Sequence, residues 1–163
     1  MVSVVGAGAG AAAPPARLRV LFDTSALVKR YAAEEGRERV LALFALATEL
    51  VVAAHCRTEM AAALLRKWQD KSLSRSDFER AWCRAQEDVA DMEQVPVDAH
   101  VERFAVAAME HSPLRTLDAL HLGSALAARV DLFVTADRRQ AHVAQQMGLK
   151  TECVAGTLRK EAA

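Results

Sequence analysis

The stretch LRVLFDTS, residues 18–25, is a short apolar run that stops abruptly at Asp23. Four similar runs recur along the chain: LVVAA (50–54), QVPV (94–97), LFVT (132–135) and KTECV (150–154). Short, nearly continuous apolar segments of this kind are typical of parallel strands that are covered by helices on both faces. The five runs therefore predict one central, mainly parallel sheet.

The segments between these runs favour helices. The pattern predicts a helix over 25–47 that is broken near Gly36, and another over 57–71 with an apolar stripe at four-residue spacing. Further helices are expected after a Ser76–Glu79 capping box, after Asp98, over 116–129, and over 138–147 with Gly148 at its end. Strands that alternate with helices indicate the α/β class, here a three-layer α/β/α sandwich.

The stretch VVGAGAGAAAPP, residues 4–15, has the glycine spacing of a dinucleotide-binding loop. Such a loop must lead into a helix, but Pro14 and Pro15 stand where the helix would begin. We therefore expect no dinucleotide. The predicted organisation is a disordered Gly/Ala/Pro-rich tail over 1–17, one domain over 18–155 and a C-terminal tail over 156–163.

Composition narrows the classes of function. Lys plus Arg and Asp plus Glu both total 21, so net charge does not draw the chain to nucleic acid, although a local basic rim remains compatible with it. The three widely spaced cysteines indicate free thiols in a reducing cytosol. Outside the small-residue tail, no apolar run approaches the roughly 18 residues of a membrane helix. We expect a cytoplasmic protein with no membrane contact.

Acidic residues follow several of the predicted strands. Asp23 ends the first run, Glu59 opens the helix after the second, and Asp137 follows the fourth. The carboxyl ends of parallel strands meet at one edge of a sheet, which is where ligands bind in open α/β folds. Asp118, in an apolar helical turn, is a fourth candidate. Each acid also has a structural interpretation, because Asp23 and Asp137 suit helix caps and Glu59 suits a first turn.

Convergence of the four acids would require a cation. Two carboxylates about 4 Å apart repel by about 4 kcal/mol at an effective dielectric constant near 20. Oxygen ligands without His or Cys favour a hard ion, Mg²⁺ or Mn²⁺. Carboxylate-bound Mg²⁺ commonly serves phosphoryl transfer, which makes phosphodiester or phosphate-ester hydrolysis the expected chemistry.

Four segments carry a family resemblance: FDTSALVKRY (22–31), TEMAAAL (58–64), LRTLDALHLGSAL (114–126) and LFVTADRR (132–139). Together they resemble the PIN-domain nucleases, most of all the VapC-type toxins of bacterial toxin–antitoxin pairs. The resemblance implies a Mg²⁺- or Mn²⁺-dependent endoribonuclease that uses metal-activated water. Its catalytic and metal-binding residues would be Asp23, Glu59, Asp118 and Asp137, and its supporting hydroxyl groups those of Thr24, Ser25 and Thr135.

The resemblance also implies partners, namely an RNA substrate, a VapB-like antitoxin and a second copy of the chain in a homodimer. Five basic residues flank the acidic motifs and are candidates for RNA phosphate contacts, with solvated surface charge as the alternative: Lys29, Arg30, Arg115, Arg138 and Arg139. His55 and His121 lie near the acidic motifs, and for both we expect packing or surface roles before chemical ones.

Two other functions compete with the ribonuclease. A catalytically silent PIN fold that binds RNA or protein would lack one of the acids, and all four are present. A phosphatase similar to the haloacid dehalogenases also places an Asp after its first strand. It requires an acid or a comparable group two residues later, where this chain has Ser25.

Overall fold

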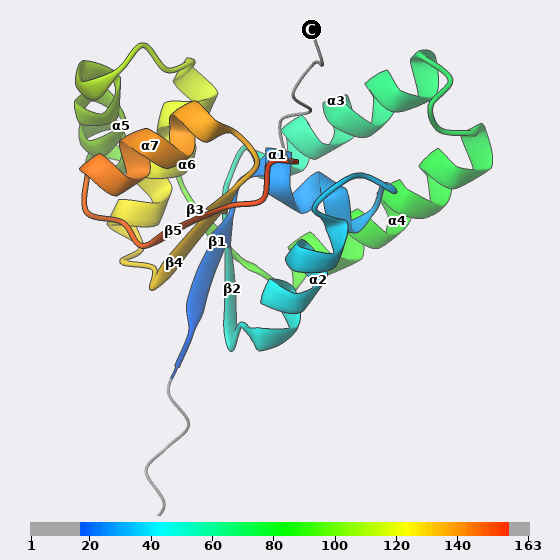
Figure 1. Ribbon diagram of the computed structural model, residues 1–163, viewed down its shortest axis with the longest axis horizontal. Coiled ribbons are helices and arrows are strands. Elements are labelled where there is room, and N and C mark those ends of the chain that lie inside the picture. The colour runs from blue at the N-terminus through cyan, green and yellow to red at the C-terminus, as the bar shows by residue number, and fades with distance from the viewer. Residues whose placement is uncertain (1–16, 157–163) are drawn as a thin grey trace, which may run out of the picture.

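The computed structural model describes residues 17–156 of the chain (Figure 1). The expected tails, including the glycine-rich stretch 4–15, lie outside the described residues except for Arg17 and Gly156 at the two boundaries. Within the described part, no helix is both long enough and apolar enough to span a bilayer.

A five-stranded sheet runs through the centre of the molecule. Its strands are β1 (Arg19–Phe22), β2 (Glu49–Ala53), β3 (Glu93–Val95), β4 (Leu132–Thr135) and β5 (Thr151–Cys153). The strand order is β3-β2-β1-β4-β5, and every neighbouring pair is parallel. All five predicted strands are therefore confirmed, with ends that differ by at most two residues.

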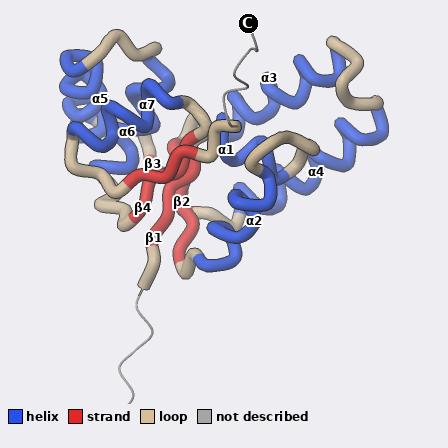
Figure 2. Tube along the Cα trace, viewed as in Figure 1, coloured by secondary structure: helices blue, strands red, loops and turns tan. Residues whose placement is uncertain are grey.

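Helices cover both faces of this sheet. They are α1 (Thr24–Leu27), the 3₁₀ turn η1 (Val28–Arg30), α2 (Arg37–Leu46), α3 (Cys56–Gln69), α4 (Arg75–Ala90), α5 (Ala99–His111), α6 (Thr116–Ala127) and α7 (Arg138–Gln146). Helices α5 to α7 lie on one side of the sheet and α1 to α4 on the other (Figures 1 and 2). Alternate residues of β1 belong to opposite cores. Val20 and Phe22 face α1 to α4, and Leu21 faces α5 to α7. The three-layer α/β/α sandwich is confirmed.

The break expected near Gly36 is present and has a steric cause. The segment 25–47 divides into α1, η1 and α2, and Gly36 precedes α2 with a φ of 88°. A Cβ atom at this position would lie 2.4 Å from the carbonyl oxygen of Val154. Only glycine combines the left-handed backbone with this close approach.

One predicted cap is wrong. Helix α4 is capped by Ser74 and not by Ser76: the Ser74 hydroxyl accepts a hydrogen bond from the backbone nitrogen of Asp77 at 3.1 Å. Both serines stand three residues before an acid, so the sequence offers two overlapping capping patterns. Helix α4 uses the earlier one. Asp98, by contrast, caps α5 as predicted.

The strand order determines where a ligand can bind. From β1 the chain first builds outward through β2 and β3, and it later returns to add β4 and β5 on the other side of β1. The direction of winding reverses between β1 and β4, and such a reversal leaves a crevice beyond the carboxyl ends of the two strands. Asp23 directly follows β1 at this point.

Candidate functional site

A pocket of about 700 Å³ opens beyond the carboxyl ends of the central strands. Its lining includes all four predicted acids: Asp23, Glu59, Asp118 and Asp137. Each acid is supplied by a different helix start, of α1, α3, α6 and α7 respectively. The fold thus gathers four carboxyl groups from distant parts of the sequence into one concave surface.

Asp23 is the most buried of these acids, with 2% of its surface exposed. Its Oδ1 caps α1 by accepting a hydrogen bond from the backbone nitrogen of Ala26 at 2.9 Å. The Ser25 hydroxyl lies 2.8 and 2.9 Å from its two oxygens. Burial raises the pKa of Asp23 above its usual value, although the charge of His121 and the hydrogen bonds act to lower it. The hydrogen bonds therefore fix the orientation of the Asp23 carboxylate, but the surrounding positive charge does not offset the cost of burying its negative charge.

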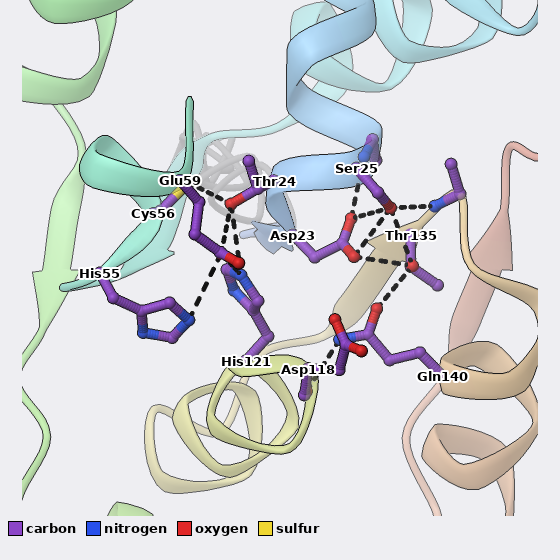
Figure 3. Close-up of polar contacts among 12 residues, drawn as sticks. Asp23, Thr24, Ser25, His55, Cys56, Glu59, Asp118, His121, Thr135 and Gln140 are labelled. Carbon is purple, nitrogen blue, oxygen red and sulfur yellow. Dashed lines mark hydrogen bonds and ion pairs between the residues drawn. The ribbon is translucent and has the colours of Figure 1, made fainter. Parts of the chain in front are cut away.

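A buried chain of hydrogen bonds extends from Asp23 to the neighbouring helices. Thr135 Oγ1 lies 2.9 Å from Asp23 Oδ2 and 2.7 Å from Gln140 Oε1. Gln140 Nε2 donates to the backbone carbonyl of Asp118 at 2.8 Å, which turns Oε1 toward Thr135 (Figure 3). The Thr135 hydroxyl has one proton and so donates to only one of its two acceptors at a time.

Asp137 and Asp118 differ in how they are held. Asp137 Oδ1 caps α7 by accepting hydrogen bonds from the backbone nitrogens of Arg139 (2.8 Å) and Gln140 (3.1 Å). The side chain of Asp118 forms no hydrogen bond or ion pair with another residue in 17–156. Burial and the negative charge of Asp137 raise the pKa of Asp118, and the charge of Glu59 adds to this effect. Two of the acids thus repel Asp118 across the pocket.

Glu59 belongs to a second polar cluster, beside the Asp23 network (Figure 3). Its Oε2 lies 2.6 Å from His121 Nε2 and 2.8 Å from the hydroxyl of Thr24. Burial acts to raise the pKa of Glu59, but the hydrogen bond and charge of His121, together with Thr24, bring it below the usual value. His121 is 1% exposed, as its expected packing role requires, but it also positions an acid of the pocket.

His55 completes this cluster from the start of α3. Its ring centre is 4.3 Å from that of His121, and its Nε2 is 3.6 Å from Glu59 Oε2. The sequence pattern suggested a surface or packing histidine. The structure places it partly buried against His121 and close to an acid of the pocket.

The five basic candidates divide into two groups. Lys29, Arg115 and Arg139 line the pocket. Arg30 and Arg138 are not among its lining residues. Arg30 Nε donates to Asp88 at 2.8 Å and its guanidinium lies 3.9 Å from the centre of the Phe44 ring. Arg138 hydrogen-bonds to the carbonyl of Gly156.

The sequence pattern did not single out several residues that line the pocket or position its acids. Arg66 and Lys67 of α3 line the pocket, and Lys67 pairs with Glu34, another lining residue. Their spacing of seven and eight residues from Glu59 places all three on one side of the helix, which was a usable signal. Gln140 stands three residues after the Asp137 cap, the position of a capping-box glutamine, yet its side chain turns to Thr135 and Asp118 instead.

The donor set of the pocket fits a hard divalent cation. Carboxylate and hydroxyl oxygens dominate its inner end, and such ligands suit Mg²⁺ or Mn²⁺. The raised pKa values of Asp23 and Asp118 indicate negative charge that the neighbouring residues do not fully compensate. A bound cation would supply that compensation.

With this geometry in place, comparison with known proteins identifies the family. The family model of the PIN domain matches residues 20–146, which cover all four acids. The chain therefore belongs to the PIN domain family, and the predicted resemblance to that family is confirmed. No curated protein gives a significant match to the sequence.

Three solved structures show the same fold at low sequence identity. A toxin–antitoxin complex from Klebsiella pneumoniae has a TM-score of 0.61 and 14% identity, covering 85% of this chain and 99% of that chain. VapBC2 from Rickettsia felis, bound to a promoter DNA fragment, has a TM-score of 0.60 and 13% identity over 83% and 98%. VapC20 from Mycobacterium tuberculosis, a sarcin-ricin loop cleaving toxin, has a TM-score of 0.60 and 14% identity over 80% and 95%.

Proposed function

We propose that this chain is a metal-dependent endoribonuclease and the toxin of a VapBC-type toxin–antitoxin pair. The observation that carries the proposal is the single pocket lined by Asp23, Glu59, Asp118 and Asp137 in a member of the PIN domain family. The presence of all four acids argues against a catalytically silent binding module. Membership of the PIN domain family argues against the dehalogenase-like phosphatase.

We assign two roles to the residues of the pocket, cation binding and the positioning of the carboxylates. Asp23, Asp118 and Asp137 would hold Mg²⁺ or Mn²⁺, with Glu59 completing the acidic set. When bound, the cation would acidify a water molecule and neutralise charge on the scissile phosphate. Ser25 and Thr135 keep the Asp23 carboxylate in one orientation through their hydroxyl groups, while Thr24 does the same for Glu59.

The rim of the pocket supports a nucleic-acid substrate. Five basic residues line it beside the acids: Lys29, Arg66, Lys67, Arg115 and Arg139. Phosphate contacts of this kind position a strand without reading its sequence. Lys29 already interacts within the protein, because its ammonium group donates a hydrogen bond to the backbone carbonyl of Glu35 at 2.8 Å. Arg115 and Arg139, at the starts of α6 and α7, are our main candidates for the phosphate contacts.

The proposed partners follow from the similar structures. Two of them are toxin–antitoxin or VapBC assemblies, so we propose a VapB-like antitoxin that inhibits this chain. We also retain the homodimer as a proposal from the family resemblance. Co-expression with a small DNA-binding protein encoded next to this chain, followed by co-purification, would test the antitoxin.

The direct test is RNA cleavage by the purified chain. We expect cleavage of cellular RNA in Mg²⁺ or Mn²⁺, loss of cleavage in EDTA, and recovery when the cation is restored. Sequencing of the new 5′ ends after brief expression would identify the RNA target, and ligation without prior phosphorylation would show that those ends carry phosphate. Cleavage that continues unchanged in EDTA would contradict the metal-dependent mechanism.

We further propose that the functional domain begins near Leu18. The backbone nitrogen of Leu18 donates to the Thr48 hydroxyl at 2.7 Å, and its carbonyl accepts from Thr48 at 2.9 Å, so the chain joins the sheet region here. We expect deletion of residues 1–16 to leave both the RNA cleavage rate and the unfolding temperature within experimental error. A large decrease in either quantity would assign a role to the glycine-rich segment.

A further inference from the structure

The cluster beside the acidic pocket has the composition of a different kind of metal site. His55, Glu59 and His121 each offer one ligand atom, and these atoms all lie within 4.8 Å of one another. Two imidazole groups and one carboxylate are a recurrent ligand set for zinc, which leaves further positions open for water. Mg²⁺ prefers oxygen ligands and binds imidazole nitrogens weakly.

The distances suit a shared ion. Neighbouring ligand atoms in a tetrahedral zinc site lie about 3.4 Å apart, given bonds of about 2.0–2.1 Å. His55 Nε2 and Glu59 Oε2 are already 3.6 Å apart, while His121 Nε2 and Glu59 Oε2 are 2.6 Å apart. A cation between the latter two atoms would replace their hydrogen bond after a small separation of the side chains. Because His55 and Glu59 are four residues apart, both ligands project from one side of α3.

The histidines are also poorly satisfied without an ion. Both ring nitrogens of His55 and Nδ1 of His121 are buried and form no hydrogen bond of normal geometry among residues 17–156, although the backbone of Leu117 lies close enough to interact with the His55 ring. The two rings lie next to each other beside the Glu59 carboxylate (Figure 3). Buried polar atoms without partners are rare in folded proteins and call for a specific explanation. A metal ligated by Nε2 of both rings would give the buried Nε2 of His55 the partner that it lacks.

We propose that His55, Glu59 and His121 form a zinc site adjoining the acidic pocket, and that zinc there inhibits the enzyme by withdrawing Glu59. The inhibitory part rests on the proposed ribonuclease function. Glu59 is common to both sites, so a zinc ion that ligates its carboxylate beside the histidines removes it from the set formed with Asp23, Asp118 and Asp137. Binding of zinc itself does not depend on that function.

Cobalt(II) provides a direct readout of the site, because Co²⁺ with nitrogen ligands in four-coordinate geometry absorbs visible light far more strongly than octahedral Co²⁺. We expect the tag-free, metal-free full chain to develop such absorption up to one Co²⁺ per chain, and Zn²⁺ to abolish it by displacement. His55→Gln should weaken Zn²⁺ binding at least about tenfold, since one of three ligands is lost. The partly exposed His55 is a safer substitution than the buried His121.

Two matched variants separate this site from others. His100→Gln removes an exposed histidine of α5 and should keep the spectrum, while Asp118→Asn alters the acidic pocket outside the three proposed ligands and should also keep it. An unchanged spectrum in folded His55→Gln, or only weak octahedral absorption in the unaltered chain, would overturn the proposed site.

The inhibitory effect is measured separately, as the fraction of each protein's own Mg²⁺-supported cleavage that survives a slight excess of Zn²⁺. We expect the unaltered chain to lose most of its rate and His55→Gln to lose much less. Equal inhibition of the two proteins would overturn the regulatory role. If the chain cleaves no RNA in Mg²⁺, the ribonuclease proposal fails, and with it the inhibition, while the cobalt spectrum still decides the zinc site.

Discussion

Asp118→Asn should lower the rate of Mg²⁺-dependent RNA cleavage at least about a thousandfold. The amide keeps the shape of the side chain but removes a negative charge from the set that would bind the cation. One charge pair at about 4 Å and an effective dielectric constant near 20 contributes about 4 kcal/mol, which corresponds to about three powers of ten in rate. The side chain has no hydrogen bond within residues 17–156 that the change would break, so the protein should fold normally.

The measurement is single-turnover cleavage of a defined RNA in Mg²⁺, together with growth of cells that express each protein. Asp118→Asn should relieve growth inhibition. Asp91→Asn is the matched control, because Asp91 is an exposed acid at the end of α4, away from the pocket lining, and its variant should cleave and inhibit like the unaltered chain. Full activity in purified Asp118→Asn would remove this residue from the proposed site.

Asp23→Asn should have two effects of opposite sign, a comparable loss of cleavage and a gain in stability of the metal-free protein. An asparagine fits the buried hydrogen-bond chain without a buried charge. Its oxygen can accept from Ala26 and Ser25, while its amide donates to Thr135, whose single proton is then free for Gln140. We expect a gain on the order of 1–3 kcal/mol in the free energy of unfolding.

The gain should depend on pH with a definite sign. Because burial raises the pKa of Asp23, the folded protein binds this proton more tightly than the unfolded chain does. The carboxyl group therefore favours folding when protonated, and that contribution is lost as the pH rises through the raised pKa. The advantage of Asp23→Asn over the unaltered chain should be largest near neutral pH and should vanish toward about pH 4, the usual Asp range.

Thermal unfolding with and without Mg²⁺ provides the check. In a chain of this size each kcal/mol changes the unfolding temperature by roughly 2–4 °C. Mg²⁺ should raise the unfolding temperature of the unaltered chain, since it binds only the folded state, and should have little effect on Asp23→Asn. If metal-free Asp23→Asn unfolds at a lower temperature than the unaltered chain at pH 7, burial of the charge is not the dominant cost at this position.

Much of the fold was predictable because the apolar runs of the sequence have nearly the same limits as the buried strands of the sheet. The run LFVT matches β4 residue for residue, and all four of its side chains are buried, so the apolar run and the strand have the same limits. Asp23, Glu59 and Asp137 converge because parallel strands bring their carboxyl ends to one edge, which follows from topology alone. Their catalytic and metal-binding roles remain proposals.

The side-chain arrangement inside the pocket was not predictable in the same way. The contact between His121 and Glu59 depends on how α6 and α3 approach each other across the end of the sheet, and local sequence does not encode that approach. Arg30 flanks an acidic motif in sequence, yet it projects toward Asp88 and Phe44 because the 3₁₀ turn rotates it away from the pocket. Ser74 and Ser76 offered equivalent caps, and local pattern did not distinguish them.

The helix caps have a consequence for how this pocket can evolve. Asp23 and Asp137 each use one carboxylate oxygen to hold a helix end, so a change at either position alters folding and chemistry together. Glu59 and Asp118 carry no such duty: Glu59 is positioned by Thr24 and a histidine from another helix, and Asp118 by no side-chain hydrogen bond within residues 17–156. Asp23 and Asp137 are thus tied to the scaffold through backbone hydrogen bonds, and Glu59 is tied to it through the buried His121, which leaves Asp118 as the acid of the pocket that can change at least cost to folding. Descendants of this chain that alter their choice of cation should therefore change first at Asp118, while the Asp23 side stays constant.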